Sequence, residues 1–303
     1  MVIQPVHQIL FRQFGCEDKV NDQIYHRMKH CDLCPHQCGV DRLSGETGIC
    51  GVTSEPRIYQ HFVHLGEELC LIPAFIVNFA GCNLNCPDCA ERHRWSLPSL
   101  KTGDPDAYAQ KLAAYWKKHG FPKSLEWIGG EPSVNLDFVL KNSVKLKTLL
   151  QDECPEIYLN TNVYFSNDLI VWMKKIVDGF VFDLKCFPGC SKILVGYQNY
   201  FEVVTKNIQS IYEQWPADKL ILRHLMLPGH FECCTKPVIQ WCRQYVPDLT
   251  FNLMTTFHSM EGHTPEILSQ KERESGIQYL THSGLKHVLM DGEQVFSNAT
   301  EQL

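Results

Sequence analysis

The chain has 303 residues, of which 44% are hydrophobic, and a formal net charge of −6. This length can bury a substantial core, as one large α/β domain or as one domain with a small appendage. The acidic balance and the lack of a basic run argue against nucleic-acid binding. The apolar runs are shorter than the roughly 20 residues of a membrane span, and the first residues lack a signal-peptide pattern. We therefore expect a cytoplasmic protein with no nucleic-acid or membrane partner.

Residues 1–60 are rich in cysteine, histidine and glycine and show no long periodic run, so we expect an irregular segment there. From residue 74 onward, short apolar segments alternate with longer amphipathic ones. The expected strands are 74–81, 124–130, 156–162, 179–186, 219–227 and 249–254. The expected helices are 106–120, 135–151, 167–176, 201–213 and 235–245, with Asn135 as the N-cap of the second.

Six strands alternating with helices predict a parallel sheet with right-handed crossovers, either open and doubly wound or rolled into a partial barrel. In both architectures the chemistry lies at the C-terminal ends of the strands. We divide the chain into an N-terminal irregular segment with a metal site (1–72), the α/β barrel (73–258) and a C-terminal extension (259–303). The extension is expected to pack a helix and a strand on the open side of the barrel.

Three cysteines, Cys82, Cys86 and Cys89, follow the first barrel strand at the spacing C-x3-C-x2-C. Three thiolates cannot ligate all four irons of a [4Fe–4S] cluster, so one iron stays open to an exogenous ligand. The alternative is a zinc site completed by a distant histidine or cysteine. Disulfides within so tight a group are disfavoured, and the 15 cysteines of the chain therefore indicate a reducing compartment.

Polar or flexible residues end four of the expected strands. They are Gly129, Gly130, Glu131, Asn160, Asn162, Asp183, Lys185 and Arg223. Paired glycines let the backbone approach a ligand closely, and a carboxylate can bind a cationic amine. Side chains two residues apart on a strand point to one face, which predicts that Asp183 and Lys185 lie together. A simple Gly-Gly turn and a buried Asp–Lys pair are the structural alternatives.

The C-x3-C-x2-C motif after a first strand resembles the signature of the radical SAM superfamily. The resemblance implies a partial (β/α)6 barrel, a [4Fe–4S] cluster on the three cysteines, and S-adenosyl-L-methionine bound to the open iron. Reduction would cleave that cofactor to a 5′-deoxyadenosyl radical, which abstracts hydrogen. The eight strand-end residues named above would bind the cofactor. Gly129, Gly130 and Glu131 would position its amino end.

The strand ends, together with "CDLCPHQCGVDRLSGETGICG" and "YQNYFEVVTKNI", are similar to the activating-enzyme branch. The nearest group is the pyruvate formate-lyase activating enzyme-like Fe–S proteins, over roughly Cys31 to Met254. This implies an oxidoreductase that abstracts hydrogen from a partner protein, as glycyl-radical activases do, with an electron donor such as flavodoxin or ferredoxin. Two alternatives stay open: radical modification or methylation of a small molecule or peptide, and a non-catalytic Fe–S electron-transfer or scaffold protein. Asp88, where the superfamily usually has an aromatic residue, keeps the last one open.

A second cysteine group, Cys31, Cys34, Cys38 and Cys50, has the spacing C-x2-C-x3-C-x11-C. Four thiolates can close a metal site completely. Such a site is either structural zinc, which stabilises a small irregular segment, or an auxiliary iron–sulfur cluster. The spacing does not choose between them.

The remaining cysteines carry weaker signals. Cys186 and Cys190 flank the sequence Phe-Pro-Gly beside Asp183 and Lys185, where a substrate-facing role is conceivable but less favoured than a structural one. The adjacent pair Cys233 and Cys234 is interpreted as structural.

Overall fold

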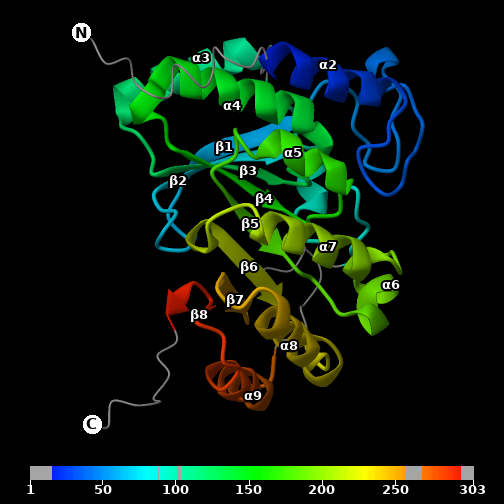
Figure 1. Ribbon diagram of the computed structural model, residues 1–303, viewed down its shortest axis with the longest axis vertical. Coiled ribbons are helices and arrows are strands. Elements are labelled where there is room, and N and C mark those ends of the chain that lie inside the picture. Colours follow the sequence, from blue (N-terminus) through cyan, green and yellow to red (C-terminus); the bar gives the residue numbers. More distant parts are fainter. Residues whose placement is uncertain (1–15, 88, 101–103, 257–267, 295–303) are drawn as a thin grey trace.

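The computed structural model describes residues 16–87, 89–100, 104–256 and 268–294 (Figure 1). Its strands are β1 Ile58–His64, β2 Ala74–Phe79, β3 Ser124–Gly129, β4 Glu156–Thr161, β5 Gly179–Asp183, β6 Leu220–Leu225, β7 Thr250–Met254, β8 His287–Met290 and β9 Glu293–Gln294. Its helices are α2 Cys16–Lys29, α3 Pro105–His119, α4 Leu136–Leu150, α5 Ile170–Met173, α6 Ser191–Leu194, α7 Tyr200–Tyr212, α8 Lys236–Tyr245 and α9 Gln270–Thr281. No helix of this part of the chain is long and apolar enough to cross a membrane.

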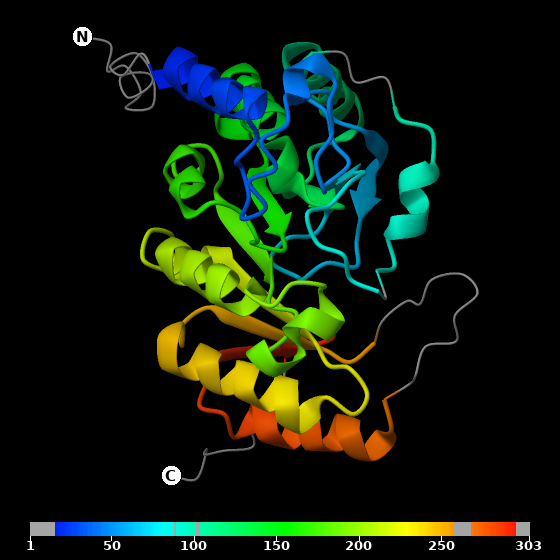
Figure 2. The ribbon, with the colours of Figure 1, turned by 90° about the vertical axis from the view of Figure 1, so that its right-hand side faces the viewer.

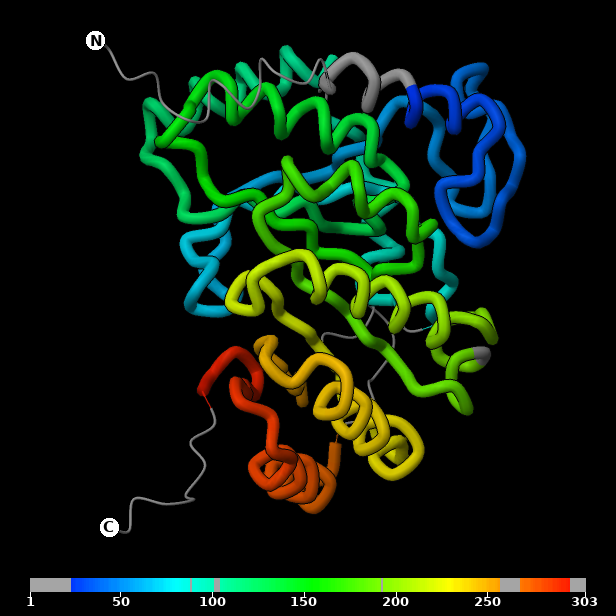
Figure 3. Tube along the Cα trace, in the orientation of Figure 1, coloured from blue at the N-terminus to red at the C-terminus, as the bar shows by residue number. Residues whose placement is uncertain are grey.

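The strands form one sheet in the order of the sequence, from β1 to β9. Strands β2 to β8 pair in parallel, and β1 and β9 add antiparallel edges. Because neighbours in sequence are neighbours in the sheet, the trace runs steadily from α2 at one end of the molecule to α9 at the other (Figures 2 and 3). The predicted parallel α/β barrel architecture is confirmed, and β8 extends it by one strand.

Strand residues alternate between a helix-facing apolar side and a more polar inner side. Trp127 of β3 packs edge-on against Phe138 of α4, and its indole nitrogen donates a hydrogen bond to Ser143 at 3.0 Å. Between the buried Leu125 and Trp127 stands Glu126, which a period of two directs to the opposite face. The helices therefore cover one side of the sheet, and the inner side combines polar groups with a small apolar cluster of Leu71, Tyr158, Val181 and Ile221.

The prediction of an irregular N-terminal segment is wrong at its two ends, where α2 and β1 form. Helix α2 has a mostly polar sequence, and over 23–29, where its side chains are described, Ile24 and Met28, one turn apart, are buried. So narrow an apolar stripe gives little periodic signal. Strand β1 lies at the edge of the sheet and has an irregular register between Ile58 and Gln60. This irregularity weakens the alternation of apolar and polar residues by which a strand is predicted.

Two local predictions are confirmed only in part. The segment expected as a helix over 167–176 is a 3-10 turn, Asn167–Leu169, followed by the single turn of α5. Asn135 is the N-cap residue of α4, as predicted, but it makes no side-chain capping bond, because a 3-10 turn over Pro132–Asn135 precedes α4. The capping residue of that turn is Glu131, whose carboxylate accepts a hydrogen bond from the Ser133 amide.

Candidate functional site

The three-cysteine loop leaves the C-terminal end of β2, and the end of β3 fixes its first residues. The Gly130 amide donates to the Phe79 carbonyl at 2.6 Å, and the Glu131 amide donates to the Gly81 carbonyl at 2.9 Å. A Cβ atom on Gly130 would lie 1.9 Å from the Gly81 oxygen. Both predicted glycines, Gly129 and Gly130, thus allow two backbones to meet where the loop begins.

Cys82 is held by hydrogen bonds to its sulfur. The Leu84 amide and the Asn162 side-chain amide each donate to the Cys82 Sγ at 3.4 Å. Asn162 also donates to the Asn83 side-chain oxygen at 2.9 Å, so it orients the start of the loop. Hydrogen bonds to ligand sulfurs are a usual feature of iron–sulfur sites. Asp88, between Cys86 and Cys89, lies outside the described residues.

Glu131 is fully buried, and both of its carboxylate oxygens have partners. One accepts from the Ser133 amide at 2.9 Å and from the Thr161 hydroxyl at 2.6 Å, and the other accepts from the Asn162 amide at 2.8 Å. Burial raises the pKa of Glu131. The hydrogen bonds act to lower this pKa, but burial outweighs them. Glu131 therefore ties the end of β3 to the end of β4, and its contact with a cofactor amine stays a prediction.

Asp183 and Lys185 form the ion pair that their spacing predicts. The Lys185 ammonium lies 2.8 Å from the Asp183 carboxylate, and each side chain is 33% exposed. Burial lowers the pKa of Lys185, but the negative charges of Asp183 and Cys86 outweigh it and raise that pKa. The pair is thus close enough to the cysteine loop for their charges to interact. This is expected if both lie at the C-terminal ends of the strands, which we call the rim.

Arg223 and Asn160 belong to a second polar group, which we call the inner-face cluster, and the backbone of Arg223 is level with Asp183 in the register of β5 and β6. Its members are Glu67, Glu68, Glu126, Asn160, Arg223 and Asn252. Arg223 binds Glu68 through two hydrogen bonds, at 2.9 Å and 2.6 Å, and also pairs with Glu67. Asn252 donates to Glu68 at 2.7 Å. Removing Arg223 would leave buried carboxylates without their counter-charge, a strongly destabilising change.

Glu126 is the incompletely satisfied member of the inner-face cluster. The residue is fully buried; Oε2 accepts a 3.2 Å hydrogen bond from Asn160, and Oε1 has no partner. Burial and the nearby charge of Glu67 raise the pKa of Glu126 from its ordinary 4.5 to about 8. The side chain is therefore a neutral acid at neutral pH.

This shift predicts a pH-dependent stability. The folded chain holds the Glu126 proton more tightly than the unfolded chain, so the stabilisation is complete below the ordinary pKa and is lost as the pH rises through about 8. We expect the free energy of unfolding to fall by on the order of 3 kcal/mol over this window, and Glu126→Gln to remove most of that fall. Thermal unfolding at a series of pH values from acidic to alkaline measures this loss of stability. The control is Glu153→Gln, because Glu153 is exposed. Equal pH profiles for wild type and Glu126→Gln would contradict the assignment.

The charges of Cys31, Cys38 and Cys50 act on the Cys34 thiol, and a metal site shared by the four cysteines stays a prediction. Burial raises the pKa of Cys34 to about 12, and the negative charges of Cys50, Cys31 and Cys38 add to the rise. Yet within the described residues these four do not form a compact group with all ligand atoms inside 4.8 Å. Arg42, also buried, anchors the segment to the barrel by donating 2.7 Å hydrogen bonds to the Thr53 and Val134 carbonyls.

The two cysteine groups are adjacent. The His36 ring contacts the Asn83 carbonyl oxygen at 2.7 Å, which joins the N-terminal segment to the three-cysteine loop. A Cβ atom on Gly81 would lie 2.8 Å from the Cys50 oxygen. Cys50 and Cys82 line one cavity of about 460 Å³, together with Arg92, Trp95 and Tyr197 among others. Metal centres held by the two groups would therefore be close neighbours.

Several of these residues were missed by the sequence analysis. Glu126 was detectable, because it is a charged residue inside the apolar strand "SLEWIGG". Glu67, Glu68, Asn83 and Asn252 give no such signal, because only the fold brings them to the site.

Comparison with known proteins finds a matching family and a curated relative. Residues 74–177 match the family described as "4Fe-4S single cluster domain". An uncharacterized protein of Methanocaldococcus jannaschii is 29% identical over 234 residues, which cover 75% of this chain and 65% of that protein. The chain thus spans about two thirds of the length of this curated relative.

Two solved structures share the fold. A radical SAM methyltransferase from Sphaerobacter thermophilus aligns with a TM-score of 0.54 at 12% identity, over 72% of this chain and 66% of that one. SuiB of Streptococcus suis, bound to S-adenosylmethionine, aligns with a TM-score of 0.50 at 13% identity, over 69% of this chain and 47% of its own. At identities this low, the similarity shows a shared fold and nothing further.

Proposed function

From a chain with the radical SAM fold and the three-cysteine motif of that superfamily, we propose a [4Fe–4S] cluster on Cys82, Cys86 and Cys89 with S-adenosyl-L-methionine at its open iron. When bound and reduced, these cofactors supply a 5′-deoxyadenosyl radical that abstracts hydrogen. One observation carries the proposal. A three-thiol loop at the C-terminal end of β2 has two N–H groups directed at its Cys82 sulfur and borders a cavity of about 460 Å³.

The residues present fit such a cluster. The loop itself supplies three thiols, which match a cluster that keeps one iron open. Burial, followed by the charge of Glu131, raises the pKa of the Cys82 thiol, so a bound cation is what would make this sulfur a thiolate. The ammonium of Lys185 is placed to offset the charge of Cys86, since it acts to lower the pKa that burial raises.

The eight predicted cofactor residues divide among three roles in this proposal. Asp183 and Lys185, partly exposed beside the cysteine loop, would bind the polar groups of S-adenosylmethionine, and Gly129 and Gly130 would present backbone to it. Asn162 and Glu131 would position the loop. Asn160 and Arg223 lie in the inner-face cluster, and we assign them to the lining of the barrel beneath the cofactor.

An electron paramagnetic resonance measurement tests cofactor binding. The reduced, reconstituted chain should give a cluster signal whose shape changes on adding S-adenosylmethionine, because the cofactor alters the coordination of one iron. Lys185→Met should keep the signal but weaken the response to the cofactor. A spectrum that ignores added S-adenosylmethionine in the wild type would favour the electron-transfer or scaffold alternative.

For the substrate, we propose hydrogen abstraction from a glycine of a partner protein, on the resemblance to activating enzymes. The competing hypothesis is radical modification or methylation of a small molecule or peptide. Dialysis of a cell extract separates the two. Stimulation of S-adenosylmethionine cleavage by the retained macromolecular fraction supports a protein substrate, and stimulation by the dialysate supports a small one. Flavodoxin or ferredoxin remains the expected class of electron donor.

For the four-cysteine group, we expect an auxiliary iron–sulfur cluster. Its thiols converge but are not as compact as a single tetrahedral zinc would require. The reconstituted wild type should then hold about eight irons, and Cys34→Ala about four. Iron, sulfide and zinc counts on both chains measure this. About four irons plus one zinc in the wild type, with the zinc lost in Cys34→Ala, would establish structural zinc instead.

A further inference from the structure

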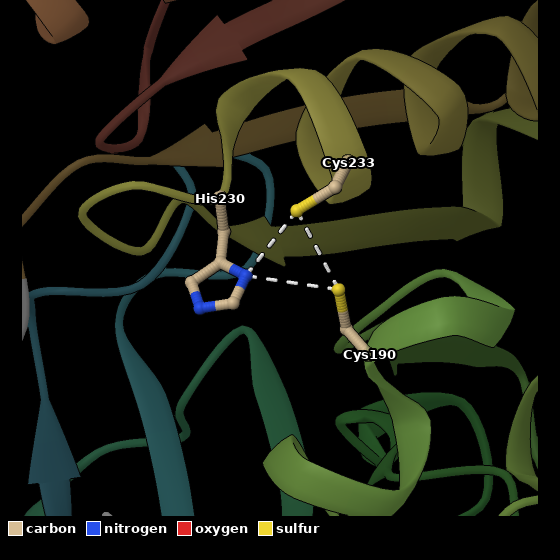
Figure 4. A group of neighbouring side chains, drawn as sticks. All are labelled: Cys190, His230 and Cys233. Carbon is tan, nitrogen blue, oxygen red and sulfur yellow. Dashed lines mark hydrogen bonds between the residues drawn. The ribbon is translucent and has the colours of Figure 1, made fainter.

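A third group of metal-ligating side chains lies outside both cysteine motifs. Cys190, His230 and Cys233 point toward one another, with their three candidate ligand atoms within 4.8 Å (Figure 4). The two sulfurs are 3.6 Å apart, and the His230 Nδ1 lies 3.6 Å from Cys190 and 3.4 Å from Cys233. Among the described residues, this group has the spacing of a single-ion site.

The distances match a tetrahedral zinc ion. With zinc–sulfur bonds of about 2.3 Å and a zinc–nitrogen bond of about 2.0 Å, two sulfurs stand about 3.8 Å apart and sulfur and nitrogen about 3.5 Å apart. The ligand sulfurs of a [4Fe–4S] cluster lie farther apart, because each binds a different iron. A disulfide would bring the sulfurs to about 2.05 Å. The observed 3.6 Å separation of the Cys190 and Cys233 sulfurs therefore fits neither of these.

We propose that Cys190, His230 and Cys233 bind one zinc ion. His230 and Cys233 are three residues apart at the start of a π-helical turn, Phe231–Thr235, a rare conformation that is frequent at functional sites. Cys190 comes from the 3-10 turn Pro188–Cys190, which follows β5. The ion would join the loops after β5 and β6 at the C-terminal end of the sheet.

Among the described residues, no fourth ligand joins this group, so a bound ion would keep one position for another ligand. The neighbouring Cys234 is buried, and its sulfur accepts a hydrogen bond from the Phe187 amide at 3.1 Å; that sulfur is not one of the atoms that lie within 4.8 Å of one another. Cys233 is exposed. Three protein ligands with one open position are the pattern of zinc sites that bind water or a substrate group. The ligand class is therefore water, displaceable by an anionic sulfur or oxygen.

The site adjoins the rim of the barrel. His230 and Lys185 line one small pocket, together with His224 and Cys234. The proposed zinc site therefore lies close to the Asp183–Lys185 pair. The inference does not depend on the proposed radical chemistry, because zinc binding needs neither the cluster nor S-adenosylmethionine.

Zinc counting on the full chain tests the proposal. The protein is purified anaerobically with a thiol reductant, incubated with Zn²⁺ and dialysed against a weak chelator. Wild type should retain one zinc ion more than Cys233→Ser and one more than His230→Ala. Because all three chains share the four-cysteine group, its metal cancels in the difference. Co²⁺ in place of Zn²⁺ should give the visible bands of a tetrahedral thiolate site in the wild-type minus Cys233→Ser difference spectrum.

Cys70→Ser is the matched control, since Cys70 is also an exposed thiol but belongs to none of the three groups. It should bind as much zinc as the wild type. Circular dichroism checks that each variant folds, and the exposure of Cys233 favours that for Cys233→Ser. Equal zinc in wild type and both ligand variants would overturn the proposal. So would a Cys190–Cys233 disulfide in the anaerobically purified chain.

Discussion

Replacing Cys86 with alanine is expected to remove about four irons per chain and to reduce S-adenosylmethionine cleavage to background. Cys82, Cys86 and Cys89 are the three thiols available on this loop, and two ligands rarely hold a four-iron cluster. Burial raises the pKa of the Cys86 thiol, and the positive charge of Lys185 acts to lower it. Iron and sulfide analysis of the reconstituted chain measures the loss, and the 5′-deoxyadenosine assay measures the activity.

The control for this substitution is Cys154→Ala, since Cys154 is a partly buried thiol that precedes β4, at the opposite end of the strand from the cysteine loop. It should keep the full iron content. Unchanged iron and activity in Cys86→Ala would mean that the cluster is held elsewhere. The four-cysteine group would then be the remaining candidate.

Replacing Gly130 with alanine should have the largest effect on folding. The new Cβ would lie 1.9 Å from the Gly81 oxygen and 2.7 Å from the Gly81 carbonyl carbon, both rigid backbone atoms. Either the end of β3 or the start of the cysteine loop must move, which breaks the hydrogen bond from the Glu131 amide to the Gly81 carbonyl. We expect a loss of more than about 3 kcal/mol in the free energy of unfolding, together with poor cluster loading.

Thermal unfolding of the Gly130→Ala chain measures this loss. Gly189→Ala is the matched control, because a Cβ at Gly189 meets nothing within 4 Å and its φ is not positive. It should unfold within about 1 kcal/mol of the wild type. Equal stability of the two variants would show that the contact between β3 and the cysteine loop is looser than described.

The six barrel strands could be predicted from the sequence because each is a short apolar run bounded by breakers. Their order followed from the β/α alternation, and the site followed from the rule that chemistry lies at the C-terminal strand ends. The pairing of Asp183 with Lys185 was predictable in the same way, since a period of two leaves them on one face.

The misses have physical causes. Helix α2 is stabilised by tertiary contacts of Ile24 and Met28 rather than by a broad apolar face. Arg223 was predicted to bind the cofactor because it is a cation near a strand end, but Glu67 and Glu68, which come from a loop distant in sequence, bind its guanidinium.

The third metal group shows the same limit. His230 and Cys233 have a recognisable H-x2-C spacing, but their partner Cys190 is 40 residues away from His230 in sequence. Only the parallel order of β5 and β6, which places the two following loops side by side, brings the three ligands together.

The most direct test of the central claim is the formation of 5′-deoxyadenosine. The anaerobically reconstituted wild-type chain is reduced with dithionite, mixed with S-adenosylmethionine and assayed for this product. We predict 5′-deoxyadenosine that depends on both the reductant and a loaded cluster. A chain with its full complement of iron that forms none would contradict radical SAM chemistry and leave electron transfer or scaffolding as the function.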